Sequence, residues 1–232
     1  LGKLDLEARI TPGYAPIFIL DQIRSYGEEL VIVAMGRLTN LAVATRLDPD
    51  LMRKVGQIYW IGGAISVSGN TSPVAEANAD GDPEAAKIVC TSNLPLIILT
   101  LDVTMHALIS QDDIDRLKRV RHPGVQHLVK IIPYYLDFYE SILGERVCAG
   151  HCGLLLALVI DPTLITKTHR LNVDVELNGR LTRSQLVADR RKLRKLTEPD
   201  TSKDEGVTVI MQADVARYHT MFMDALLGAD RT

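Results

Sequence analysis

Residues 30–47, LVIVAMGRLTNLAVATRL, contain the pattern that sets the fold class we expect for this chain. The first seven residues form an apolar run rich in Val and Ile, which is typical of a fully buried strand. From residue 38 the apolar positions recur with helical spacing. A strand followed at once by a helix is the unit from which parallel sheets covered by helices are built.

The same alternation continues over the first two thirds of the chain. The apolar runs QIYWIGG (57–63) and LPLIILTLDV (94–103) predict two further strands. Asp82 and Pro83 begin the helix between them, since Asp is favoured at the N-cap and Pro in the first turn. Later segments, such as HRLNVDVELNG, alternate apolar and polar residues as strands with one solvated face do. We therefore predict an α/β fold: a doubly wound, mostly parallel sheet with helices on both faces and late antiparallel strands.

Helices dominate the stretch between residues 110 and 160. Ser110 with Asp113 three residues later resembles a capping box, which marks a helix start. The following helical pattern contains Pro133, where we expect a kink. The segment HCGLLLALVI (151–160) is apolar on nearly all sides and predicts a buried helix.

Length and composition exclude several classes of protein. The chain has 232 residues, 47% of them hydrophobic, and this suits a single domain (residues 1–232) with a sizeable core. A net charge of −3 gives no reason to expect nucleic acid or a membrane surface as a partner. The basic stretch DRRKLRKL (189–196) has no interleaved aromatic residues, so we expect a solvated loop there. Three cysteines do not make a disulfide framework, and no apolar run reaches the length of a membrane helix. We expect a cytoplasmic protein.

A polar loop follows the second predicted strand. Residues 69–86 read GNTSPVAEANADGDPEAA, with Asn70, Glu76 and Asn78 at even spacing. These side chains could hydrogen-bond only the backbone of their own loop. Alternatively, carboxamides and a carboxylate match the vicinal hydroxyl groups of a ribose, each of which donates and accepts. Ligands in such sheets bind beyond the carboxyl ends of the strands, where this loop lies.

Several motifs, taken in order, resemble one known family. They are VAMGRLTNLAVATRLDPDL, IYWIGGAISVSGNTSPVAEANADGDPEAAKIV, LTLDVT, YYLDFY, HCGLLLALVIDPTLIT and LNVDVELNGRLTRSQLVAD. Together they are similar to the nucleoside hydrolases, the inosine–uridine preferring nucleoside N-ribohydrolases, over nearly the whole chain. The resemblance implies a doubly wound α/β fold, hydrolysis of the N-glycosidic bond of ribonucleosides with a bound calcium ion, and a homodimer or homotetramer.

The resemblance also assigns roles to individual residues. Asn70, Glu76 and Asn78 fall on the positions that hold the ribose in that family. Thr39 falls on the residue whose backbone carbonyl binds calcium, and His151 on the histidine thought to protonate the departing base.

Two departures from the family pattern concern the metal. The family begins with a strand and an Asp-rich loop, DxDxxxDD, which supplies two calcium-binding aspartates, and no such segment occurs here. The family also reads His-Asp-Pro where this chain reads His151-Cys152-Gly153. Since calcium takes about six to eight oxygen ligands, Thr39 alone leaves the site incomplete and we expect weak calcium binding or none. Three explanations stay open: a natural member that binds without cleaving, a longer protein whose front segment is lost or supplied by another chain, and a truncated gene remnant.

The sequence therefore carries more than one functional interpretation. The first is a nucleoside N-ribohydrolase by family resemblance. The second is a non-catalytic protein that binds ribose or a nucleoside, and the third is a purely structural or assembly role. Cys148, His151 and Cys152 would share one helix face and could begin a zinc site, although apolar packing is the preferred interpretation. The aromatic segment PYYLDFY (133–139) is mostly core by its spacing, and which of its rings lines the base pocket is left open.

Overall fold

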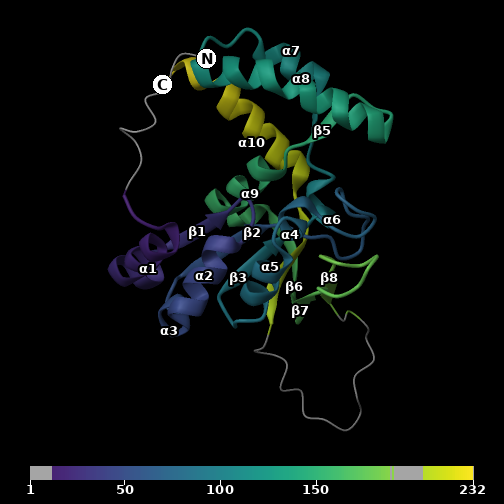
Figure 1. Cartoon of the computed structure of the whole chain (residues 1–232). Helices are drawn as coiled ribbons and strands as arrows, with labels where there is room; N and C mark the ends of the chain where they lie inside the picture. Colours follow the sequence, from purple (N-terminus) through teal and green to yellow (C-terminus); the bar gives the residue numbers. More distant parts are fainter. Residues whose placement is uncertain (1–11, 189, 191–205, 232) are drawn as a thin grey trace.

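The computed structural model describes residues 12–188, 190 and 206–231 (Figure 1). Its central element is a five-stranded sheet with the order β1-β2-β3-β9-β6. These strands are β1 (Val31–Ala34), β2 (Gln57–Ile61), β3 (Leu96–Leu99), β9 (Val207–Ala213) and β6 (Ile165–Leu171). The first four run parallel, and β6 pairs with β9 in the antiparallel direction.

Helices cover both faces of the sheet, as the alternation of strands and helices predicts. Ile58, Trp60 and Ile98 point to one face and pack in a core with α1 (Ala15–Tyr26), α2 (Thr39–Leu47), α3 (Pro49–Met52) and α5 (Pro83–Cys90). Tyr59 and Leu99 point to the opposite face, against α9 (His151–Ile160) and α10 (Val215–Leu227). Successive strand residues thus bury themselves on opposite sides, which confirms the doubly wound α/β fold.

A third hydrophobic cluster lies beyond the sheet. It joins α7 (Gln111–Leu117), α8 (Pro123–Leu143) and the far part of α10 with the two-stranded ribbon of β4 (Leu108–Ser110) and β5 (Val147–Ala149). Figure 1 shows α8 across the top of the molecule, with α10 rising from the sheet toward it. Ser110 and Asp113 form the predicted capping box at the start of α7.

A second two-stranded ribbon packs on the face of the sheet that α1, α2, α3 and α5 cover. It consists of β7 (Val173–Val175) and β8 (Leu186–Ala188), and β7 contacts α5. Ion pairs from Lys87 to Asp174 and from Arg183 to Glu84 tie this ribbon to α5. These late antiparallel strands agree with the alternating pattern of the sequence.

Three local expectations are wrong. β1 is an edge strand in the described sheet and leaves Val31 46% exposed, so the run 30–36 is not fully buried. The predicted strand 94–103 ends at Leu99, and Leu101–Thr104 form the short helix α6. In α9, Leu156 and Ile160 are exposed, because only one side of that helix faces the sheet.

Two further points concern expectations from composition. No helix in the described ranges has the length and apolar character needed to cross a bilayer. The basic stretch 189–196 lies outside the described residues except for Arg190, whose guanidinium donates a hydrogen bond to the Ser66 hydroxyl.

Candidate functional site

A cavity of about 790 Å³ opens at the carboxyl ends of β2 and β3. Its floor is formed by residues at those strand ends, including Ile61 and Leu99. One part of its wall is the loop after β2 together with α4 (Ala77–Asp80), and another part is α8 with the first residues of α9. A mostly apolar cavity with a few polar groups at the strand ends of an α/β sheet is where ligands bind in such folds.

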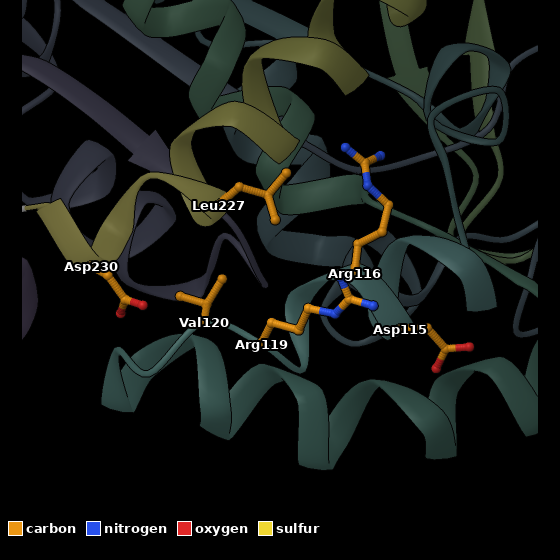
Figure 2. A pocket seen from close by; sticks show the side chains of 6 residues that line it. All are labelled: Asp115, Arg116, Arg119, Val120, Leu227 and Asp230. Carbon is orange, nitrogen blue, oxygen red and sulfur yellow. The ribbon is translucent and has the colours of Figure 1, made fainter.

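A second, more open hollow of about 490 Å³ lies between α7 and the end of α10. Figure 2 shows that the guanidinium groups of Arg116 and Arg119 point in different directions, with Asp115 and Asp230 on opposite sides. The Asp230 carboxylate already accepts hydrogen bonds from the backbone N–H groups of Arg121 and His122. Because its polar groups do not converge, this hollow lacks the character of a ligand site.

Glu76 lies at the centre of the polar wall of the larger cavity. Its side chain is 6% exposed, and its Oε2 accepts hydrogen bonds from the backbone N–H groups of Gly63 (2.8 Å) and Ala79 (3.3 Å). Burial raises the pKa of this carboxyl group, and the backbone N–H bonds partly oppose that effect. Gly63 has φ +78°, and a Cβ there would overlap Leu186, so the close approach of this backbone to Glu76 requires glycine.

Asn70 and Asn78 flank Glu76, and each uses one half of its carboxamide. Asn70 Oδ1 accepts from the Ala77 N–H (2.9 Å), and Asn78 Nδ2 donates to the Ile61 carbonyl (2.9 Å). Within the described structure, Asn70 Nδ2 and Asn78 Oδ1 make no hydrogen bond. The side chains therefore do hydrogen-bond backbone groups, as the first interpretation of the loop expects. A donor and an acceptor stay free beside the cavity, so ribose binding remains a prediction.

Asp102, which follows β3, holds the loop that carries Asn70. The Asp102 carboxylate, in α6, accepts hydrogen bonds from the backbone N–H groups of Ile65 (2.9 Å) and Ser66 (2.8 Å) and from the Thr100 hydroxyl. Burial opposes ionisation of Asp102, but the hydrogen bonds from Ser66, Ile65 and Thr100 outweigh it and lower its pKa. An ionised Asp102 thus fixes the backbone of the polar wall.

His151 lines the same cavity from the start of α9. Its Nε2 lies 2.7 Å from the Tyr139 hydroxyl and its Nδ1 lies 2.8 Å from the Thr104 hydroxyl. Burial lowers the pKa of His151 to about 4 and raises the pKa of Tyr139 to about 12. At neutral pH both groups are therefore uncharged, and the two ring nitrogens are held by two hydroxyl groups.

The wall beside His151 is aromatic. Tyr135 stacks on Tyr139, with ring centroids 6.4 Å apart, and Phe138 meets Tyr139 edge-on at 5.6 Å. Tyr135, Phe138 and Tyr139 line the cavity. The expectation that the segment 133–139 is mostly core is wrong, since Tyr134, Tyr135 and Phe138 are each more than half exposed. Flat rings of this kind suit contact with a planar base.

Four of the five predicted site residues line the cavity, and the fifth, Thr39, does not. Asn70, Glu76, Asn78 and His151 line the same cavity although 81 positions separate the first from the last. In the described structure Thr39 is not part of the cavity lining; it is the first residue of α2, and its hydroxyl donates a hydrogen bond to Asp82.

The zinc interpretation required Cys148, His151 and Cys152 on one helix, and this is wrong. Cys148 is buried in β5, while His151 and Cys152 begin α9. Among the described residues no cluster of three potential metal ligands occurs.

Three residues of the site were not predicted individually, although Tyr139 lies in the aromatic segment 133–139 and Asp102 and Thr104 lie in the motif LTLDVT. Tyr139 and Thr104 lie 12 and 47 positions from His151, and Asp102 lies 36 positions from Ser66. No local spacing predicts that α6, α8 and α9 bring Thr104, Tyr139 and His151 into hydrogen-bond contact.

The residues described around the cavity do not fit a calcium ion. Glu76 is the only carboxylate of the described lining, and its Oε2 is occupied by two backbone N–H groups. Cys152, which also lines the cavity, offers sulfur, a poor ligand for a hard cation.

Comparison with known proteins agrees with this geometry. The family described as "Inosine-uridine preferring nucleoside hydrolase" matches residues 3–220. The chain belongs to this family. Among curated nucleoside hydrolases and nucleosidases, "Probable uridine nucleosidase 2" of Arabidopsis thaliana is 33% identical over 91% of this chain and 65% of its own length. "Inosine-uridine preferring nucleoside hydrolase" of Crithidia fasciculata is 32% identical over 96% of this chain and 68% of its own length.

A solved nucleoside hydrolase has the same fold. The "Purine-Preferring Ribonucleoside Hydrolase from Gardnerella vaginalis" superposes with a TM-score of 0.85 and 30% identity, over 96% of this chain and 68% of that protein. The chain thus spans about two thirds of the length of these nucleoside hydrolases.

Proposed function

We propose that this chain binds a ribonucleoside in the large cavity and serves the hydrolysis of its N-glycosidic bond. The supporting observation is that Asn70, Glu76, Asn78, His151 and the aromatic rings of α8 line one and the same cavity. The ribose contacts the polar wall and the base contacts α8. Family membership supports the same substrate class.

The polar wall suits the transition state of this reaction. Cleavage of a ribosyl–base bond passes through an oxocarbenium-like sugar, with positive charge at C1 and the ring oxygen. Asn78 Oδ1, with its partial negative charge, and the Glu76 carboxylate, in its ionised form, stabilise that sugar, and their backbone hydrogen bonds hold them in place beforehand. Since burial raises the pKa of Glu76, its carboxylate is protonated at a higher pH than that of an exposed glutamate, and the stabilisation is lost there.

The wall beside His151 suits the departing base. As the bond breaks, negative charge grows on a ring nitrogen of the base, and a hydrogen-bond donor beside that atom lowers the barrier. His151 and Tyr139, which share a hydrogen bond, are the candidate donors in this part of the cavity. With His151 uncharged at neutral pH, the donor in the resting site is a neutral group.

A second function is binding of the ribonucleoside without hydrolysis by these residues alone. It is favoured because the described donors do not fit the calcium ion that the resemblance implies. No step of the proposed chemistry above passes through a metal.

A coupled assay separates the two functions. Inosine and uridine are offered with and without added calcium, and thermal unfolding is followed with ribose, inosine and uridine. Turnover supports the hydrolase, and a raised melting temperature without turnover supports the binding protein. If neither occurs, both proposals fail.

Matched variants test the residue assignment in the same experiments. Glu76→Gln and His151→Ala should each strongly reduce turnover or the thermal shift. Glu84→Gln, an exposed glutamate on α5 that pairs with Arg183, should retain the wild-type response. Wild-type behaviour of both site variants would refute the assignment.

A further inference from the structure

Thr104, His151 and Tyr139 form one chain of hydrogen bonds across the wall of the cavity. Thr104 Oγ1 contacts Nδ1 of the ring, and Nε2 contacts the Tyr139 hydroxyl. The Thr104 side chain is completely buried, and its hydroxyl makes no other hydrogen bond in the described structure. Tyr139 keeps 6% exposure and lines the cavity.

A neutral imidazole carries one ring proton, so the chain has two possible directions. If the proton is on Nδ1, the ring donates to Thr104 and Tyr139 donates to Nε2. The Thr104 proton then has no acceptor among the described residues; Thr104 belongs to the cavity lining, but its side chain exposes no surface to solvent. If the proton is on Nε2, Thr104 donates to Nδ1 and the ring donates to the Tyr139 oxygen. The Tyr139 proton is then the free one, and it can reach a ligand in the cavity.

The cost of an orphaned donor decides between these directions. A hydroxyl with no exposed surface and no acceptor loses a full hydrogen bond, whereas a hydroxyl on a residue that keeps some exposure at the cavity can be satisfied by water or ligand. Thr104 is 0% exposed and Tyr139 is 6% exposed. The direction from Thr104 through His151 to Tyr139 leaves no buried proton unpaired. The opposite direction strands the proton of Thr104.

We propose that Thr104 is a positioning residue that fixes the proton of His151 on Nε2 and thereby turns the Tyr139 hydroxyl toward the base of a bound nucleoside. This inference rests on the proposed function for the identity of the ligand, but the position of the ring proton does not depend on it. Thr104 itself touches no reacting atom and acts through the ring. Tyr139, rather than His151, is then the group that donates to the base.

The first test needs no substitution and no ligand. Two-bond ¹⁵N–¹H spectra of the chain labelled in histidine distinguish the two tautomers, and His151→Gln identifies the signals of residue 151 among the six histidines. We expect the ring proton on Nε2 at pH 7. A proton on Nδ1 would overturn the proposal.

The second test uses the isosteric Thr104→Val with two companions. The valine removes the group that distinguishes the two ring nitrogens, so both tautomers should appear and inosine should bind about 3- to 10-fold more weakly, while ribose affinity stays unchanged. Thr104→Ser keeps the hydroxyl and should restore the tautomer and affinity to within about twofold. Thr45→Val is the matched control, since Thr45 is equally buried but its hydroxyl bonds the Leu41 carbonyl.

The outcomes separate this inference from the proposed function. Wild-type affinity for inosine in Thr104→Val would overturn the role of Thr104 even if the protein binds nucleosides well. Failure of the wild-type chain to bind either ribose or inosine would refute the proposed function. In that case the tautomer spectra of the wild type and Thr104→Val still decide the proton position.

Discussion

The two walls of the cavity are built in opposite ways. The polar wall, which consists of Asn70, Glu76 and Asn78, is tied to backbone groups through each of its three side chains. The aromatic wall, which consists of Tyr135, Phe138 and Tyr139, makes one hydrogen bond within the described structure, and Tyr135 and Phe138 are more than half exposed. The polar wall is thus fixed before any ligand arrives, whereas the aromatic wall can adapt.

This difference matches what each wall has to recognise. A ribose presents the same hydroxyl groups in every ribonucleoside, so fixed partners cost little adaptability and stabilise the charged sugar in advance. Bases differ in size and edge, and an apolar, partly exposed wall accepts several of them. The predictions below test whether the walls contribute in this way, in order of expected effect.

Removing the carboxylate of the polar wall should have the largest effect. Glu76→Ala deletes a buried acceptor of two backbone N–H groups, and we expect nucleoside affinity to fall by about 10- to 100-fold, as for the loss of a charged hydrogen bond. Isothermal calorimetry with inosine measures the change, with Glu84→Ala as the exposed control. Equal affinities for the two variants would show that the polar wall does not bind the sugar.

His151, which lies beside the aromatic wall, should make the free energy of unfolding depend on pH. This histidine has a pKa of about 4 in the folded chain, below the ordinary value near 6.5. Between these values the unfolded chain binds a proton that the folded chain refuses, so the free energy of unfolding should fall by about 1–2 kcal/mol from pH 7 to pH 5. Urea titrations of the wild type and His151→Gln measure this slope. An identical slope in the variant would contradict the buried, neutral histidine.

Loosening the polar wall from behind should have a smaller effect. Asp102→Ala removes the acceptor for the backbone N–H groups of Ile65 and Ser66 without touching the cavity. We expect inosine and ribose to lose affinity equally, by about 5- to 10-fold, because the loop no longer starts in its binding geometry. Calorimetry with both ligands checks this. A loss confined to inosine would place the effect on the aromatic wall instead.

Trimming the aromatic wall should have the smallest effect and should concern the base alone. Phe138→Ala removes an exposed ring of the lining, and we expect inosine affinity to fall by about 3- to 5-fold with ribose unchanged. Tyr134→Ala is the matched control, because Tyr134 is the neighbouring exposed ring that does not line the cavity in the described structure. A large loss in ribose affinity would end the distinction between the walls.

The sequence predicted the polar wall better than the aromatic wall for a physical reason. Asn70, Glu76 and Asn78 lie within nine residues after one strand, so local spacing alone places them together. Tyr139, Thr104 and His151 come from three separate elements, α8, α6 and α9, and no local pattern encodes their meeting.

Long-range pairing also limited the prediction of the sheet. The mostly parallel sheet with late antiparallel strands was predicted correctly. The position of β9 next to β3 depends on contacts between residues more than 100 positions apart, which the sequence pattern does not reveal. The exposure of β1 at the edge of the described sheet was not predicted either. The role of Thr39 as a calcium ligand stays a prediction, as does the homodimer or homotetramer, which light scattering tests.

The most direct measurement of the central claim is a calorimetric titration with inosine and with 2′,3′-dideoxyinosine, which lacks the two hydroxyl groups that the polar wall would bind. We predict saturable binding of one inosine per chain and no measurable binding of the dideoxy compound under the same conditions. Equal binding of the two compounds, or binding of neither, would contradict the assignment of Asn70, Glu76 and Asn78 to a ribose.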